Sequence, residues 1–308
     1  MKIVVTGGAG FIASHIVDAY IERGHDVHIV DDFSTGQSAN LNPRATVHRL
    51  DVASPDAARL IIDVKPDVLN HHAAQMDVRR SVADPTFDAR VNIIGFVNLL
   101  EACKNNGVKK VIFASSGGAV YGDRDPIPAS EDHPTLPLSP YGVSKLSGEF
   151  YLNYYQLAFG LPYVALRYAN VYGPRQSSQG EAGVVAIFIA HFLAGQNPVI
   201  NGDGRQTRDY VFVGDVVRAN LAALDTDYIG AVNIGTGIET DVVSICGLLR
   251  QGLGSNVEAI HGPAKLGEQR RSCLEVSLAA KVLSWKPEVA LPAGLERTIA
   301  YCREAGVS

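Results

Sequence analysis

Tyr141 and Lys145 have the types and the spacing to carry proton chemistry. Four residues apart in a helix, they lie on one face, about one turn from each other. Pro140 suits a first helical turn, and Ser139 is a candidate N-cap. A lysine ammonium near the phenol would favour the phenolate and lower a pKa that is ordinarily about 10, so Tyr141 could act as a base. The same pair could instead be two exposed residues that share a helix face, so the prediction depends on what surrounds it.

A glycine-rich turn follows the first apolar run of the chain. Residues 2–6 are rich in β-branched side chains, as in a buried strand, and Gly7 and Gly10 follow in a GxxGxxA spacing that ends at Ala13. Gly7 permits a tight turn, and Gly10 lets the backbone approach a pyrophosphate at the start of the next helix. Asp31 ends the second strand, where a carboxylate would bind ribose hydroxyls and repel a 2′-phosphate. The unit predicts a site for NAD in preference to NADP.

Apolar runs and helix-like segments continue to alternate after this unit. Further strands are predicted at residues 46–50, 67–70, 109–114 and 162–167. The alternation is typical of an α/β protein with a Rossmann-type doubly wound parallel sheet, whose ligands bind at the carboxyl ends of the strands. The last third mixes short elements, so we expect a smaller mixed α/β C-terminal substrate domain. The predicted division is 1–169 with 214–236 for the NAD-binding domain, and 170–213 with 237–308 for the substrate domain.

Composition and charge exclude several classes of function. The 27 basic and 32 acidic residues give a net charge of −5 without a basic block, so we expect no nucleic acid and no membrane surface as partner. The chain shows neither the apolar stretch of a signal peptide nor a membrane-length apolar run. The four cysteines lack metal-ligand spacing and indicate free thiols in a reducing, cytoplasmic compartment. His71 and His72 would point to opposite faces of a strand, so we expect no metal.

The motifs resemble the extended short-chain dehydrogenase/reductase family, and within it the nucleotide-sugar 4-epimerases. The matching segments run through the whole chain in order: residues 6–12, 31–36, 71–75, 92–95, 115–122, 141–145, 167–174, 208–211, 233–237 and 283–287. The resemblance implies an NAD-dependent isomerase that oxidises C4 of a nucleotide sugar, turns the 4-keto sugar over, and reduces it from the other face. UDP-glucose and UDP-galactose are the expected pair, and a homodimer is expected through the aromatic helix that follows Lys145.

The resemblance also implies roles for individual residues. Tyr141 is the expected acid/base, Lys145 the residue that holds the nicotinamide ribose, and Ser116 (or Ser115, because the strand exit is one residue longer than usual) the partner of the sugar hydroxyl. The expected cofactor contacts are Gly7, Gly10, Phe11, Ile12, Asp31, Asp32, Thr35, Gly36, Asp51, Val52, His72, Ala73, Ala74, Gln75, Asn92, Tyr141, Lys145 and Tyr168. The expected substrate contacts are Ser116, Asn170, Val185, Val199, Asn201, Arg208, Lys265 and Glu268.

Two departures and several alternatives bear on the substrate. Lys265 stands where the family usually has an arginine, which Arg270 or Arg271 could replace. Ser272 is small at a position where larger side chains crowd the sugar 2-substituent, so room for an N-acetyl group is expected. A 4,6-dehydratase is disfavoured because its acidic pair is replaced by residues 117–119, which read Gly-Gly-Ala. Epimerisation or decarboxylation of a UDP-linked glucuronate remains open, as does a non-catalytic NAD-binding protein of the same fold.

Overall fold

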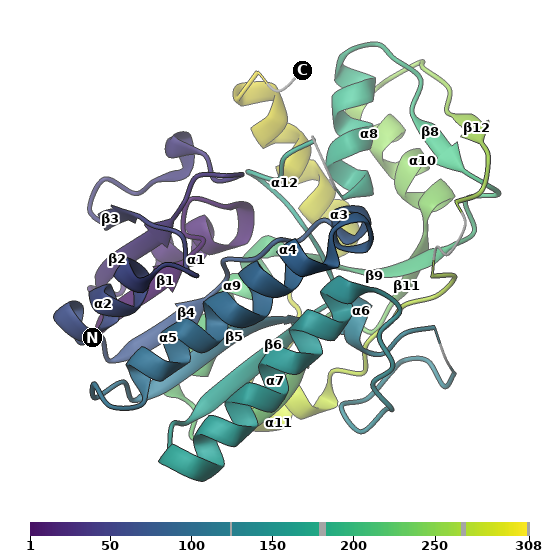
Figure 1. Ribbon diagram of the computed structural model, residues 1–308. Coiled ribbons are helices and arrows are strands. Elements are labelled where there is room, and N and C mark those ends of the chain that lie inside the picture. Colours follow the sequence, from purple (N-terminus) through teal and green to yellow (C-terminus); the bar gives the residue numbers. More distant parts are fainter. Residues whose placement is uncertain (124, 179–182, 266–268, 307–308) are drawn as a thin grey trace.

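The computed structural model describes residues 1–123, 125–178, 183–265 and 269–306. A seven-stranded parallel sheet forms its centre (Figure 1), in the order β10-β6-β5-β4-β1-β2-β3. Its strands are β1 (Lys2–Thr6), β2 (Asp26–Asp31), β3 (Thr46–Arg49), β4 (Val68–His71), β5 (Lys110–Ser116), β6 (Tyr163–Tyr168) and β10 (Gly230–Ile234). The predicted Rossmann-type doubly wound sheet is confirmed.

Helices cover both faces of the sheet because each strand of the sheet centre is apolar on both sides. On one face, α2 (Pro55–Val64), α5 (Gly95–Cys103) and α7 (Pro140–Phe159) pack over strand residues such as Leu69 and Phe113. On the other, α1 (Phe11–Glu22), α9 (Val213–Asp225) and α11 (Ser277–Leu283) pack over strand residues that include Ile3 and Ile112. The central sheet therefore lies between two apolar cores.

The second lobe, at the upper right of Figure 1, has its own apolar core. Tyr172, Phe188, Phe212 and Leu249 are buried in it. Its elements are α8 (Val184–Leu193), α10 (Val242–Leu253), α12 (Leu291–Glu304), the three-stranded sheet β11 (Glu239–Asp241), β9 (Thr207–Phe212) and β7 (Asn170–Tyr172), and the pair β12 (Ile260–Gly262) and β8 (Val199–Asn201).

The two lobes share elements at their boundary. Although residues 277–285 fall in the predicted substrate domain, Ala279, Leu283 and Trp285 pack in the core of the large sheet. The indole nitrogen of Trp285 donates to the carbonyl of Asp215 on α9 (2.9 Å). The chain thus returns to the first lobe between two passages through the second.

Short helices connect the strand ends that matter for the site. These are α3 (Val78–Ala83), α4 (Pro85–Ala89), the π-helical turn η2 (Arg90–Ile94), α6 (Gly117–Val120) and, after β2, the 3-10 turn η1 (Ser38–Asn40). No helix within the described residues is both long enough and apolar enough to cross a membrane.

Candidate active site

The turn between β1 and α1 has the shape of a phosphate cradle. Gly7 adopts a φ of +70°, and a Cβ there would lie 2.8 Å from the backbone nitrogen of Ala73, so only glycine fits. Gly10 is the N-cap of α1 and supplies no side chain to the N–H groups of the first turn. Such N–H groups, at the positive end of a 12-residue helix, favour an anion.

Asp31 closes the other side of this turn. Its Oδ2 accepts the Ala9 N–H (2.9 Å) and its Oδ1 accepts the Phe33 N–H (2.8 Å). Burial raises the pKa of the carboxyl, while the two backbone donors act in the opposite direction. A carboxylate offers about four acceptor sites, so Asp31 keeps capacity for the two ribose hydroxyls expected there.

The other residues expected to contact the cofactor follow the carboxyl ends of the first four strands. Phe11 and Ile12 open α1, Asp32, Thr35 and Gly36 follow β2, Asp51 and Val52 follow β3, and His72, Ala73, Ala74 and Gln75 follow β4. The register of the parallel strands brings all of them to one edge of the sheet. Their individual roles in holding a cofactor stay predictions.

His72 presents an unmatched polar atom at this edge. Its Nε2 lies 3.0 Å from the Tyr168 hydroxyl, which also accepts from Asn220 (2.8 Å), whereas the buried Nδ1 has no partner among the described atoms. Burial and the charge of Lys145 lower the pKa of His72 to about 3, so the ring is neutral. The glycine cradle, the spare acceptors of Asp31 and this orphaned nitrogen together fit a dinucleotide such as NAD.

Asp88 on α4 is a buried acid that the sequence did not single out. It accepts hydrogen bonds from Gln75 (3.1 Å), Asn92 (2.9 Å) and Ser144 on α7 (2.6 Å). Asn92 also exchanges hydrogen bonds with the backbone of Gln75, donating to its carbonyl and accepting from its N–H, each at 2.9 Å. Gln75 and Asn92, expected as cofactor contacts, therefore also fix the loop after β4 against the helix of Tyr141. The chain offers no local motif that would have revealed Asp88.

Tyr141, Lys145 and Ser116 converge as expected. The Ser139 hydroxyl caps α7 by accepting the Gly142 N–H (3.1 Å), so the helix starts where the sequence predicts. The Tyr141 hydroxyl is hydrogen-bonded to Ser116 at the end of β5. Lys145 Nζ donates to the Ala114 carbonyl (2.8 Å) and lies 5.8 Å from the Tyr141 ring centroid.

The pKa values of this group differ from the sequence-based expectation. Burial, followed by the charge of Asp88, raises the pKa of Tyr141 to about 12, and the Ser116 hydrogen bond offsets only part of this. Burial lowers the pKa of Lys145 to about 8, although Asp88 opposes the shift. The protein alone therefore keeps Tyr141 protonated, because desolvation outweighs the attraction of a lysine at this distance.

The structure separates the two serines at the end of β5. Ser115 is buried and donates to Glu149, which lies on α7 two turns beyond Tyr141. Ser116 is the one beside Tyr141. Successive strand residues point to opposite faces, so only one of the pair can reach the tyrosine. The geometry favours Ser116 for the expected catalytic role.

The residues expected to hold the substrate line the second lobe. Asn170 opens β7, Asn201 ends β8, and Arg208 on β9 donates to the Thr207 carbonyl (2.8 Å). The alternative of a surface ion pair between Arg208 and Asp209 does not fit, because Asp209 is fully buried on the opposite face. There it accepts from Thr236 (2.6 and 2.8 Å), Gly237 (3.1 Å) and Leu274 (3.3 Å).

The remaining residues expected to contact the substrate differ in their exposure. Val185 is 1% exposed in the core of the second lobe, so only its backbone could reach a ligand, whereas Val199 is 43% exposed. Lys265 is exposed after β12, and Glu268 lies outside the described residues. Arg270 pairs bidentately with Asp203 (2.8 and 2.9 Å), and Arg271 pairs with Glu239 (2.7 and 3.0 Å). Neither arginine can replace the usual family arginine without exchanging these partners.

The two adjacent histidines contact other side chains. His71 lies between Thr6, at 2.8 Å from its hydroxyl, and the ring of Phe96, on which it stacks at 4.5 Å. Among the described residues, no three histidine, cysteine or acidic side chains are grouped to hold a metal ion. His71 is therefore a packing residue.

Comparison with known proteins identifies the class. The pattern of the NAD dependent epimerase/dehydratase family matches residues 3–235, and the chain belongs to this family. Residues 3–235 contain the glycine cradle, Ser116, Tyr141 and Lys145.

Three proteins that match the chain over nearly their full length are UDP-glucose 4-epimerases. The UDP-glucose 4-epimerase of Mycolicibacterium smegmatis is 44% identical over 309 residues, covering 98% of this chain and 99% of the relative. The crystal structure of UDP-glucose 4-epimerase with UDP-glucose from Thermotoga maritima has a TM-score of 0.97 at 45% identity and covers 99% of both chains. The crystal structure of the Thermus thermophilus UDP-glucose 4-epimerase in complex with NAD has a TM-score of 0.93 at 40% identity, covering 99% of this chain and 100% of that one.

Proposed function

We propose that the protein is an NAD-dependent 4-epimerase that interconverts UDP-glucose and UDP-galactose. The observation that carries the proposal is the convergence of Ser116, Tyr141 and Lys145 beside a cradle that fits NAD. The full-length similarity to UDP-glucose 4-epimerases, including one complexed with UDP-glucose and one with NAD, supports the same reaction.

Each polar side chain of the group has a defined part in this reaction. NAD, when bound, would supply the hydride acceptor that inversion at C4 requires and a positive charge that favours the phenolate. Tyr141 takes the proton of the sugar 4-hydroxyl and later returns it, and Ser116 fixes the position of that hydroxyl. Lys145 is charged below a pH of about 8. Its charge adds to that of bound NAD in favouring the phenolate form of Tyr141. Asp88 holds Ser144 one residue before Lys145 and so orients the helix.

We further propose that the substrate is held mainly through its nucleotide diphosphate. Asn170, Asn201 and Arg208, with Lys265 at the rim, supply amide and cationic groups on the second lobe. Holding this end while the hexose turns over would leave either face of C4 accessible to the tyrosine. Ser272 lines a hollow of only about 10 Å³ together with Gly117, Tyr121 and Leu274. The proposal that the site accepts an N-acetyl group on the sugar therefore rests on the small side chain of Ser272 and not on this hollow.

An exposed apolar stripe supports a homodimer. On α7, Phe150, Tyr154 and Leu157 are 66%, 54% and 75% exposed, at the spacing of one helix face. A second copy of the chain would cover this stripe through the same helix. A Phe150→Glu/Leu157→Glu variant should sediment as a monomer, and an unchanged sedimentation coefficient would contradict the proposal.

The four described cysteines are all free and buried, which fits the cytoplasmic location proposed here.

A direct assay tests the proposed reaction. Purified protein without added nicotinamide is incubated with UDP-glucose, and the anomeric proton signals are followed by NMR. Appearance of UDP-galactose supports the proposal. No reaction with UDP-glucose even after NAD is added, together with turnover of UDP-glucuronate, would instead assign the protein to the uronate-acting enzymes of its family.

A further inference from the structure

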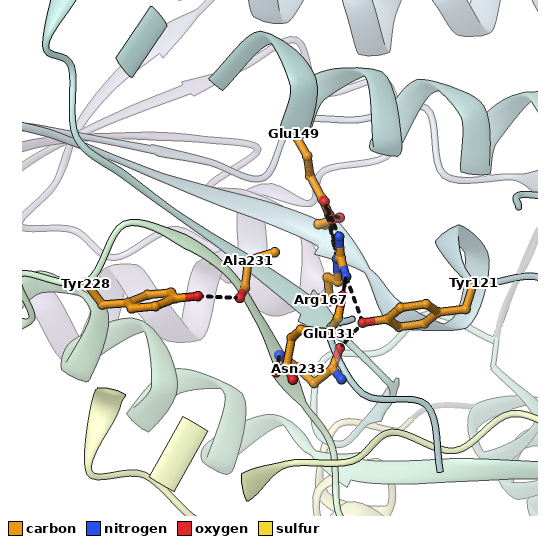
Figure 2. Close-up of polar contacts among 8 residues, drawn as sticks. Tyr121, Glu131, Glu149, Arg167, Tyr228, Ala231 and Asn233 are labelled. Atoms are coloured by element: carbon orange, nitrogen blue, oxygen red, sulfur yellow. Dashed lines mark hydrogen bonds and ion pairs between the residues drawn. The ribbon is translucent and has the colours of Figure 1, made fainter. Parts of the chain in front are cut away.

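A buried ion pair lies directly behind the candidate active site. Arg167 on β6 and Glu149 on α7 have side chains 8% and 9% exposed, and they are joined by contacts of 2.6, 3.0 and 3.2 Å (Figure 2). Removing two charges from water costs free energy that their attraction does not reliably return, and apolar replacements are often as stable or more so. Stability alone therefore does not explain the pair.

The Glu149 end of the pair holds the catalytic strand and helix together. The carboxylate accepts a hydrogen bond from Ser115, the residue before Ser116 at the end of β5. Glu149 also lies one turn after Lys145 and two turns after Tyr141 on the same face of α7. One carboxylate thus fixes the strand end that carries the serine relative to the helix that carries the tyrosine and the lysine.

The Arg167 end reaches Tyr121 on the far side of the pair from Ser115. Its Nη1 donates to the Tyr121 hydroxyl (2.8 Å), which donates to Asn233 Oδ1 on β10 (2.7 Å), as Figure 2 shows. The Asn233 amide in turn donates to the carbonyls of Ala129 (2.9 Å) and Glu275 (3.0 Å).

The loop held by Asn233 is tied to the wall of the hollow beside Ser272. Ala129 donates to the Cys273 carbonyl and accepts from the Glu275 N–H, each at 2.9 Å. Leu274, within this segment, occupies the space that a Cβ at Gly117 would enter (2.6 Å). The hydrogen bonds therefore run without interruption from the catalytic helix to residues 273–275.

We propose that Arg167 and Glu149 are positioning residues for the epimerase reaction. The proposal rests on the proposed function: the pair sets the distance between the Ser116–Tyr141 group and segment 272–275, the expected wall of the sugar site. It touches neither substrate nor cofactor and acts through Ser115 and Tyr121. An error of about 1 Å in such a distance can cost on the order of 100-fold in rate.

A set of variants separates positioning from plain stability. The double variant Glu149→Met/Arg167→Met replaces both charges by apolar groups, so no unpaired charge is left buried. Ser115→Ala and Tyr121→Phe each remove one hydroxyl of the network. Asp215→Asn is the matched control, because Asp215 is a fully buried carboxylate paired with Arg218 on α9, outside this network. For each variant, Tm, retained NAD, and kcat and KM for UDP-glucose are measured.

The expected result is a loss of kcat that does not follow Tm. The double variant should keep a Tm within a few degrees of the wild type and lose at least about tenfold in kcat, with KM and NAD content nearly unchanged. Ser115→Ala and Tyr121→Phe should each lose roughly three- to tenfold in kcat, and the control should lose Tm but not kcat. If the double variant keeps both the kcat and the Tm of the wild type, the inference is overturned. If the double variant does not fold, unchanged kcat in both single-hydroxyl variants would overturn it. An inactive wild type would instead refute the proposed function.

Discussion

The nucleotide end and the sugar end of the site are built by different means. At the nucleotide end, Gly7, Gly10 and Asp31 come from one βαβ unit, and backbone sterics decide which residues fit. At the sugar end, Gly117 meets Leu274, and Asp209 ties β9 to the turn after β10 and to Leu274. The first end is specified by local backbone geometry, and the second by side chains that are far apart in the sequence.

This difference has a functional counterpart. A cofactor that is retained through every turnover is best served by a fixed backbone cradle, which contains few rotatable groups. A sugar that must turn over needs a wall whose shape can differ between relatives, and side chains from several loops provide it. The Ser116–Tyr141–Lys145 group lies between the two ends, on strand β5 of the central sheet and on helix α7, which packs against one face of that sheet.

The largest effect is expected where the two ends meet. Tyr141→Phe removes the proton acceptor and should lower kcat by about 10³-fold, within the range of general acid–base catalysis, while NAD stays bound. Tyr151→Phe is the matched control, because Tyr151 lies on the same helix outside the proposed dimer stripe with its side chain exposed. NMR turnover and the absorbance of released NAD measure both effects. Full activity in Tyr141→Phe would support the alternative of a non-catalytic NAD-binding protein.

A smaller effect tests whether backbone sterics rule the nucleotide end. Gly7→Ala places a Cβ 2.8 Å from the Ala73 nitrogen, whereas Gly24→Ala, at a similar φ of +78°, meets open space. Gly24→Ala should lower the free energy of unfolding by about 1 kcal/mol. Gly7→Ala should lower it by about 2 kcal/mol more, and the protein should also lose its retained NAD. Urea unfolding and NAD content give the comparison. Equal costs at the two positions would contradict the steric account.

Lys145 allows a test by pH, because burying its charged ammonium group lowers the free energy of unfolding. Its pKa falls to about 8 in the folded protein from an ordinary 10.5, which corresponds to about 3 kcal/mol of destabilisation at pH 7. Lys145→Met also loses the hydrogen bond to the Ala114 carbonyl, worth about 1 kcal/mol, so the variant should be about 2 kcal/mol more stable at pH 7 while losing activity.

The sign of this effect changes the stability profile in a defined window. Below a pH of about 8 both states are protonated, so the folded protein carries the full cost. Between that pH and about 10.5 only the unfolded state holds the proton, so the wild type gains stability as the pH rises. The difference between variant and wild type should therefore shrink from pH 7 to pH 10, and a constant difference would argue against a charged, buried Lys145.

The smallest effect concerns the sugar end alone. The Ser272→Tyr ring is too large for the hollow beside Gly117 and Tyr121, so it should extend from the wall and lower kcat/KM for UDP-N-acetylglucosamine about tenfold relative to UDP-glucose, a loss typical of a steric change in a pocket. Thermal stability and NAD content serve as controls. An equal loss on both substrates would show that Ser272 does not face the 2-substituent.

How far the sequence predicts the molecule follows the same division. The sequence predicts the strands observed at 2–6, 68–71 and 110–116 to within two residues, at 2–6, 67–70 and 109–114, and it predicts the helix capped by Ser139 as well, because apolar periodicity and capping are local. The roles of Asp88, Asp209 and the Arg167–Glu149 pair could not, because each depends on partners brought together only by the fold. The raised pKa of Tyr141 was missed because the desolvation that causes it comes from the surrounding fold.

The most direct test of the account follows the hydrogen at C4. UDP-glucose carrying deuterium at C4 is incubated in ordinary water with the protein and its retained NAD, and the product is analysed by NMR and mass spectrometry. If hydride leaves and returns to the same carbon while Tyr141 exchanges only the hydroxyl proton, UDP-galactose should keep the deuterium at C4. Loss of the label to solvent would contradict the proposed reaction, because it would require C4 inversion by proton abstraction from carbon.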